Sequence, residues 1–314
     1  MDPVCHSLVG ATLGESGLKR ETGLGMATLL VAANLPDLDI LAYFAGPYTA
    51  LWFRRGITHG ILAWLLLPLL LTGAMLVWDR VVRHRGGRVP DRPVIPRQLL
   101  LLALLGVWTH PLLDLLNTYG IRLLMPFSDT WFFGDTLFIV DPWVWAVLSL
   151  GIVLQRRRNR GRHVGVRRPA VAAVVVVALY IAAMAASNVA ARGFVTRAVV
   201  AQGLPEPVRL MIAPMPVNPF QRRVVMEIGD RYRFGHWYWL SPRLELADLE
   251  YDTEPTDFGA AAATRGPEVR KFLSWARFPY WETVDGVEGR TVYVGDARYT
   301  LDARGGSWAT IAVR

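Results

Sequence analysis

Ionisable side chains interrupt the apolar stretches of this chain, and the pair His110 and Asp114 has the clearest spacing. The two residues stand four apart in THPLLDLLNTYG, so both project from one face of a helix. That spacing suits two ligands of a single metal ion. Asn117 lies three residues beyond Asp114 and extends the same face. Ionisable groups inside membrane segments are costly, which makes them candidates for function.

Three other segments carry the same residue types. His6 lies in the first short apolar stretch, and His59 follows RRGIT at the start of a longer one. Asp37 and Asp39 follow Pro36, which breaks a helix and lets two carboxylates turn inward. Imidazole and carboxylate ligands suit zinc first, with manganese, iron or magnesium as alternatives. These residue types are therefore consistent with a divalent metal site.

The composition indicates a membrane protein. Hydrophobic residues make up 53% of the 314 residues and charged residues 19%, whereas an ordinary soluble domain has about 25% charged residues. This composition excludes a disordered or fibrous chain, and the single cysteine, Cys5, excludes an internal disulfide and a Cys-rich zinc site. The net charge of +8 resides mainly in loops between apolar segments. Membrane topology explains such loops, so we expect no nucleic-acid partner.

The apolar segments predict the architecture of residues 1–191. Four runs are long enough to cross a bilayer, and they cover residues 57–78, 98–117, 137–154 and 170–189. Two shorter runs, 4–17 and 24–34, flank a polar turn and predict a short helical hairpin that dips into the bilayer. We therefore expect a mainly α membrane domain of about four transmembrane helices plus this N-terminal hairpin.

Basic loops predict the orientation of these segments. Arginines or lysines crowd the turn 18–23 and the loops 79–97 and 155–168, and such loops stay in the cytoplasm. The loops 45–56 and 119–135, together with everything after residue 189, then lie on the outer side. The start MDPVCHSLVG shows no cleavable signal peptide. In this topology the His and Asp groups of all four segments reach the same outer depth.

The composition changes after about residue 191. Several prolines precede short alternating runs at 224–228, 236–240, 291–295, 298–302 and 308–314. Alternation with β-branched and aromatic residues is typical of strands. Residues 192–314 are therefore predicted to form a small β-rich extracytoplasmic domain, and the sequence does not identify its partner.

Four motifs, HSLVG, NLPDLD, RRGITHG and HPLLDLLNTYG, resemble in content and order those of the YdjM-like family of LexA-regulated, inner-membrane, metal-dependent hydrolases. The resemblance covers roughly residues 1–150 and implies a place in the bacterial cytoplasmic membrane. The implied metal ligands are His6, Asp37, His59, His110 and Asp114. Asp39 and Asn117 would support these ligands. Family members often have histidine where this chain has Arg54. The order of His and Asp ligands is also similar to that of zinc-dependent phospholipase C.

The expected activity is hydrolysis by a multi-pass membrane protein. A metal-activated water would attack an ester or phosphoester. A lipid or other amphiphile fits as substrate because it already partitions to this depth. Asp39 is the expected general base or ligand-orienting group, and Asn117 would orient substrate or a ligand. Arg54, Arg55 and Arg122 are expected near the outer rim, where they would hold an anionic group such as phosphate.

Two other function classes remain open. The same buried His and Asp residues would also serve a transporter or an ion or proton pathway. Only about four full spans and the absence of an internal repeat argue against that alternative. A membrane protein without enzymatic activity, whose outer domain binds a partner, is the third hypothesis.

Overall fold

The chain forms two compact units. The computed structural model describes residues 1–85, 89–160, 167–255, 259, 266–286, 289–305 and 308–313. The first unit comprises Met1–Asp39 and Arg55–Met184, and the second comprises Ile40–Arg54 and Ala185–Arg314. Part of the predicted basic loop 155–168, residues 161–166, lies outside the described residues.

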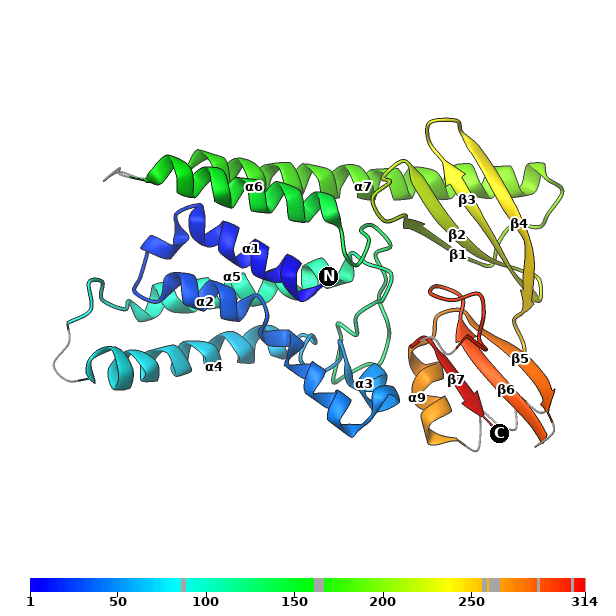
Figure 1. Cartoon of the computed structure of the whole chain (residues 1–314), viewed down its shortest axis with the longest axis horizontal. Coiled ribbons are helices and arrows are strands. Elements are labelled where there is room, and N and C mark those ends of the chain that lie inside the picture. Colours follow the sequence, from blue (N-terminus) through cyan, green and yellow to red (C-terminus); the bar gives the residue numbers. More distant parts are fainter. Residues whose placement is uncertain are drawn as a thin grey trace. The chain divides into compact units, whose positions relative to one another are not determined.

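The first unit is helical (Figure 1). Its elements are α1 (Pro3–Glu15), η1 (Leu18–Arg20), α2 (Gly25–Ala32), the start of the 3-10 helix η2 (Leu35–Ala45), α4 (Ala63–Trp78), η3 (Asp79–Arg83), α5 (Pro96–Leu115), α6 (Pro142–Asn159) and the first half of α7 (Arg168–Ala201). Helix α2 packs against α1, α4 and α5, and α1 also packs against α6. The predicted N-terminal hairpin is therefore formed by α1 and α2.

Two glycines allow α2 to approach its neighbours closely. A Cβ atom on Gly10 of α1 would lie 2.8 Å from the carbonyl oxygen of Leu29, and one on Gly106 of α5 would lie 2.5 Å from the Cβ of Ala32. Small residues at such crossings let helix backbones pack tightly in a membrane. The end of α2 is thereby held against the face of α5 that carries His110.

Within the residues that the structure describes, three helices are long and apolar enough to cross a membrane: Ala63–Arg83, Pro96–Leu115 and Arg168–Ala201. They correspond to three of the four predicted spans. Helix α6 occupies the place of the fourth, but it begins only at Pro142 and its last turn carries three arginines. A fourth candidate span is the pair Gly25–Ala32 and Leu35–Ala45, which is bent by 44° at its break. Pro36 lies just beyond this break, as the second residue of η2.

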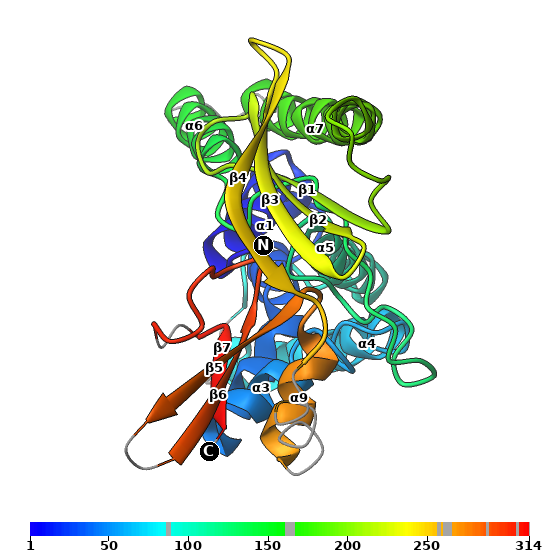
Figure 2. The same ribbon diagram turned by 90° about the vertical axis from the view of Figure 1, so that its right-hand side faces the viewer.

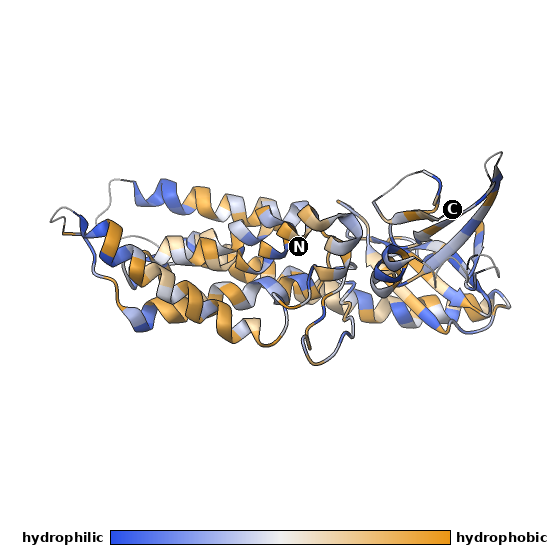
Figure 3. Ribbon diagram, turned by 90° about the horizontal axis from the view of Figure 1, so that it is seen from below, coloured by the Kyte–Doolittle hydropathy of each residue, from blue (hydrophilic) through white to orange (hydrophobic). Residues whose placement is uncertain are grey.

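Helix α4 presents leucines to its surroundings. Leu65, Leu66, Leu69 and Leu70 are each more than half exposed within the chain, at 57%, 54%, 56% and 68%. A row of exposed leucines would be unfavourable in water but suits lipid. The helices of this unit are mostly coloured hydrophobic in Figure 3, with hydrophilic residues towards some of their ends. The helical unit is therefore that of a membrane protein.

The predicted basic loops meet at one end of this unit. The amide of Gly23 donates to the carbonyl of Pro93 at 2.8 Å, and the hydroxyl of Thr22 accepts from the amide of Ile95 at 2.7 Å. The guanidinium of Arg156 donates to Glu15 at 2.9 Å. The turn 18–23, the loop before α5 and the end of α6 are therefore neighbours, as the shared side in the predicted topology requires.

The second unit combines two antiparallel sheets with helices (Figure 2). One sheet has the order β1 (Arg209–Pro214), β2 (Gln221–Ile228), β3 (Arg231–Tyr238) and β4 (Arg243–Asp252); the other has β5 (Pro279–Gly286), β6 (Gly289–Asp296) and β7 (Thr310–Val313). The helices are α3 (Pro47–Phe53), α9 (Pro267–Trp275) and the second half of α7. A β-rich C-terminal part was predicted and is confirmed.

Strand β2 of the first sheet is buried on both faces. Val224 and Met226 belong to a cluster with Val195 of α7, whereas Val225 between them belongs to a second cluster with Tyr280 of β5. The period of two expected for a strand thus sends alternate residues into two cores. The apolar residues of the run VVMEI are therefore covered on both sides of the strand.

One predicted strand is wrong. Residues 298–302 form a turn region, in which the amides of Tyr299 and Thr300 both donate to the carbonyl of Asp296. The cause is a buried ion pair: the guanidinium of Arg298 lies 2.7 Å from the carboxylate of Asp296, and both side chains are fully buried. A local charge pair thus overrides the alternating pattern of these residues.

Helix α3 was not predicted within the loop 45–56, and it packs against α9. The ammonium of Lys271 donates to the hydroxyl of Thr49 at 2.9 Å, and Tyr48 donates to the carbonyl of Thr310 at 3.3 Å. The predicted topology places this loop and the C-terminal domain on the same side of the membrane. Their contact agrees with that placement.

Candidate metal centre

The candidate centre is built on one stripe of α5. Gly106, His110 and Asp114 are spaced by four and share a helix face. Because Gly106 has no side chain, the end of α2 comes close enough for the carbonyl of Ala33 to reach Nδ1 of His110 at 2.7 Å. Helix α2 ends at Ala32, so the Ala33 carbonyl makes no hydrogen bond within the helix and can accept from His110.

This contact determines the form of the His110 ring. A carbonyl only accepts hydrogen bonds, so Nδ1 of His110 must carry the proton. Its Nε2 atom is then left with a lone pair, which is the form that binds a metal. Histidine ligands usually have their second nitrogen held in this way by a carbonyl or carboxylate.

His59 is held in the same form by two neighbours. The hydroxyl of Thr58 donates to Oδ2 of Asp39 at 3.2 Å, so its oxygen can accept from Nδ1 of His59, 3.0 Å away. The same carboxylate oxygen of Asp39 lies 3.3 Å from Nδ1 of His59. Burial lowers the pKa of His59, which precedes α4, and Asp39 opposes that shift. Nε2 of His59 is therefore also a lone-pair donor.

The two imidazoles point these lone pairs at each other. The Nε2 atoms of His59 and His110 are 3.1 Å apart. Two lone pairs at that distance repel unless a proton or a cation lies between them. Asp114 places Oδ2 3.3 Å from Nε2 of His59 and 3.5 Å from Nε2 of His110. Among the residues described, this buried oxygen has no hydrogen-bond donor.

Asp37 completes a set of four donors that fits a metal. Its Oδ1 lies 3.7 Å from Nε2 of His110, and donor atoms of Asp37, His59, His110 and Asp114 all lie within 4.8 Å of one another. Donors at the corners of a tetrahedron with zinc bonds of ~2.1 Å are separated by ~3.4 Å. The three donor pairs around His59, His110 and Asp114 are close to that spacing. This buried cluster could hold a metal ion.

The comparison with protein families decides which family the chain represents. A model described as the YdjM inner membrane protein matches residues 1–191. The chain belongs to the YdjM family. The resemblance predicted from the four motifs is thereby confirmed. No curated protein and no solved structure matches the chain.

His6, the fifth implied ligand, occupies a different position in this YdjM protein. Its ring stacks on His110 with centroids 3.7 Å apart, and its Nε2 lies 3.4 Å from Oδ1 of Asp114. That oxygen also accepts from the amino group of Met1 and from Arg55. His6 is therefore brought to the cluster, but on the Oδ1 side of Asp114 rather than among the four grouped donors.

The two predicted supporting residues both lie beside the ligands. Asp39 orients His59 and also accepts the amide of Arg55 at 2.7 Å. The side-chain oxygen of Asn117 accepts from Nη1 of Arg55 at 2.9 Å and from the amide of Tyr119 at 2.8 Å. Both residues are buried. Each thus positions neighbouring groups of the YdjM cluster.

The three predicted anion-binding arginines occupy different environments. Arg55 is buried, and its guanidinium lies 3.0 Å from Oδ1 of Asp114 and over the ring of Tyr119. Arg122 is also buried; it pairs with Asp129 at 3.3 Å, and its guanidinium lies over a tryptophan ring. Arg54 belongs to the second unit. Arg55 therefore balances the charge of a candidate ligand.

Sequence reasoning missed three groups that hold the cluster, two side chains and one main-chain carbonyl. Thr58 links Asp39 to His59, and Ser7 exchanges hydrogen bonds with Asn34 at 3.1–3.3 Å, which ties α1 to the end of α2. Thr58 precedes His59 and Ser7 follows His6 in the sequence. Adjacency to a predicted ligand was therefore the signal that could have revealed these two side chains. The Ala33 carbonyl carried no such signal because a main-chain group is present at every residue.

Proposed function

We propose that this YdjM protein is a membrane-bound metal-dependent hydrolase that cleaves an ester or phosphoester. The observation that carries the proposal is the convergence of two lone-pair imidazoles and two carboxylates within 4.8 Å of one another. The absence of cysteine from this set favours hydrolytic chemistry, and zinc is the first choice of metal. The ligands would be Asp37, His59, His110 and Asp114.

The residues of the chain divide the work. When bound, the metal would lower the pKa of a coordinated water to about 7 and polarise a carbonyl or phosphoryl oxygen. Asp39 holds the His59 ring in the binding orientation through Nδ1. Arg55 offsets the negative charge of Asp114, and Asn117 holds Arg55 in place. His6, stacked on His110, limits the movement of that ring.

A lipid or another amphiphile is the substrate class that the surroundings favour. An apolar pocket of about 270 Å³ lies among α1, α5, α6 and α7. Thr109 and Leu113 line it and directly precede His110 and Asp114 in α5. An acyl chain in such a pocket would lie beside the helix that carries two of the ligands. Concave, mainly apolar sites with few polar groups are typical of ligand binding.

A transporter is the second candidate, favoured by one observation. The break between α2 and η2, where the helix pair bends by 44°, lies next to Asp37. Interrupted helices beside a polar site are common in transporters. The structure has three candidate spans, or four with the bent pair, within the residues that it describes. That small number favours the hydrolase.

Activity of the full-length protein in detergent tests the proposal. Zinc-loaded protein should release nitrophenol from a nitrophenyl carboxylic ester or a nitrophenyl phosphodiester, or should hydrolyse phosphatidylglycerol in micelles. A chelator should abolish the release and added metal should restore it. Protein that retains its metal, cleaves none of these substrates and carries the metal across vesicle membranes would instead be a transporter.

The orientation of the C-terminal domain is a further prediction. A cysteine introduced at the exposed Ser241, between β3 and β4, should react with an impermeant maleimide from the extracytoplasmic side of intact cells. The native Cys5 is buried and provides the unreactive background. Labelling only after the inner membrane is opened would contradict this orientation.

A further inference from the structure

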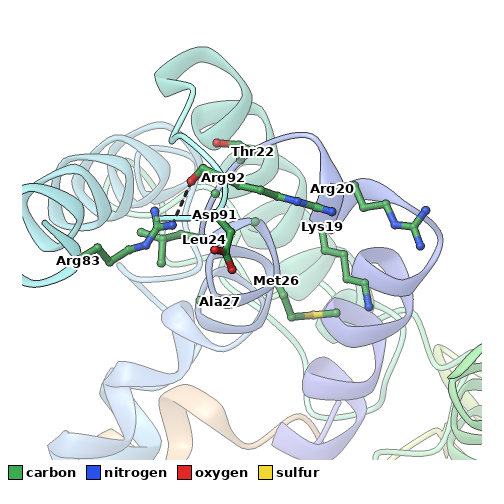
Figure 4. A pocket seen from close by; sticks show the side chains of 11 residues that line it. Lys19, Arg20, Thr22, Leu24, Met26, Ala27, Arg83, Asp91 and Arg92 are labelled. Atoms are coloured by element: carbon green, nitrogen blue, oxygen red, sulfur yellow. Dashed lines mark hydrogen bonds between the residues drawn. The ribbon is translucent and has the colours of Figure 1, made fainter. Parts of the chain in front are cut away.

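A second polar pocket lies at the basic end of the helical unit, and it is independent of the metal cluster. Its volume is about 510 Å³, and Figure 4 shows the side chains around it. It lies between the turn 18–23, the start of α2, the end of η3 and the loop before α5. Four cationic side chains and one carboxylate line it: Lys19, Arg20, Arg83, Arg92 and Asp91.

Two of the four cations are already paired. The ammonium of Lys19 lies 2.5 Å from Glu15, and Arg83 lies 2.5 Å from Asp79 and donates to the carbonyl of Arg92 at 3.0 Å. These bonds fix the walls of the pocket.

The other two cations are available to a ligand. Neither Arg20 nor Arg92 has a side-chain hydrogen bond or ion pair within the described residues, and both are exposed. The pocket therefore offers two guanidinium groups that a bound anion could engage. Guanidinium groups recognise phosphate oxygens well because they donate in a planar fork.

The backbone adds donors to the same pocket. Helix α2 begins here at Gly25, and Leu24 before it has φ 64° and supplies no side-chain cap. In the part of the chain that is described, the amides of Met26 and Ala27 donate to no other backbone group. An uncapped helix start carries partial positive charge and free N–H groups, both of which favour an anion.

Two chain segments that line this pocket approach each other closely at Gly23. Gly23 donates to the carbonyl of Pro93, and a Cβ atom on Gly23 would lie 2.7 Å from the carbonyl of Arg92 and 2.9 Å from Nη1 of Arg83. Only glycine allows the two chain segments to lie this close. The Gly23 hydrogen bond therefore joins the loop before α5 to the residues just before α2, and both segments line the pocket.

We propose that this pocket binds a phosphate-bearing anion. Two sources share this chemistry: the headgroup of an anionic phospholipid and a free phosphate ion. The predicted topology places the pocket at the cytoplasmic face, where anionic lipids are enriched and basic pockets between membrane helices bind their headgroups. Asp91 opposes the anion and sets a limit on its affinity.

The test uses the full-length protein in a neutral detergent. Native mass spectrometry compares the retention of phosphatidylglycerol with that of phosphatidylcholine, and calorimetry measures binding of inorganic phosphate. The wild type should retain phosphatidylglycerol more strongly than phosphatidylcholine, or bind inorganic phosphate, or both. The double variant Arg20→Gln/Arg92→Gln should weaken that binding by about tenfold or more, since it removes two positively charged hydrogen-bond donors.

Two further variants make the result specific. Arg85→Gln removes the same charge from an exposed residue outside the pocket lining and should leave binding unchanged. Asp91→Asn removes the opposing carboxylate and should strengthen binding, a gain that misfolding cannot produce.

Each outcome has a defined meaning. Preference for phosphatidylglycerol without binding of inorganic phosphate identifies the lipid headgroup, and the reverse identifies the free ion. The proposal is overturned if neither anion binds, if the double variant binds as well as the wild type, or if Arg85→Gln loses as much as the double variant.

Discussion

Replacing His59 with alanine, or Asp114 with asparagine, is expected to empty the metal centre. Purified wild-type protein should carry about one equivalent of divalent metal per chain, and each variant should fall close to background, as expected when one of four protein ligands is lost. His59 and Asp114 both contact the central donor, Nε2 of His110, at 3.1 and 3.5 Å.

His84→Ala is the matched control for this experiment. His84 is half exposed, lies just after η3 and pairs with Asp79 rather than with the cluster. The variant should keep the metal content of the wild type. Metal analysis after dialysis, with circular dichroism to confirm that helices persist, gives the comparison. Equal metal content in His59→Ala and wild type would contradict the centre, whatever the activity.

The same cluster shows what sequence reasoning can predict. Buried imidazoles and carboxylates in apolar helices are costly, so their shared depth predicted that the four donors meet. The spacing of His110 and Asp114 predicted that they share a face. The position of Arg55 could not be predicted in this way, because it follows from a left-handed backbone conformation, φ 52°, two residues after the end of α3. Its guanidinium reaches Asp114 only through that turn.

The membrane helices were predicted better than their ends. Apolar length alone identified the helices α4, α5 and α7, which are the candidate spans. Helix α7 continues to Ala201, well beyond the predicted end at residue 189, because Ala191, Val195 and Val199 pack on the first sheet of the second unit. A hydrophobic run cannot distinguish lipid contact from protein contact, so the change of environment along α7 was not visible.

The sequence also did not reveal the full division of the chain into two units. Residues 40–54 are apolar enough to be read as part of the membrane domain, yet they group with the C-terminal unit through the contact of α3 with α9. Contacts between segments more than 200 residues apart leave no local pattern. The strands missed at 209–214, 243–252 and 279–286 have a similar cause, since their neighbours in the sheets determine their pairing.

Asp39→Asn is expected to weaken metal binding by about 10–100-fold, the usual range for loss of a residue that orients a ligand. Asp39 accepts from the amide of Arg55, from Thr58 and from Nδ1 of His59, at 2.7, 3.2 and 3.3 Å. Without the carboxylate charge, the proton of His59 is no longer held on Nδ1. Part of the population then carries it on Nε2, which cannot bind a metal in that form.

The readout separates a positioning residue from a ligand. At saturating zinc Asp39→Asn should still bind about one equivalent, because the donor set itself remains intact. Competition with a chromogenic chelator measures the affinity. Thr58→Val should shift it in the same direction by a smaller factor, and Thr58→Ser, which keeps the hydroxyl that bonds to Asp39, should restore it. Complete loss of metal in Asp39→Asn would make Asp39 a ligand, whereas wild-type affinity would remove it from the centre.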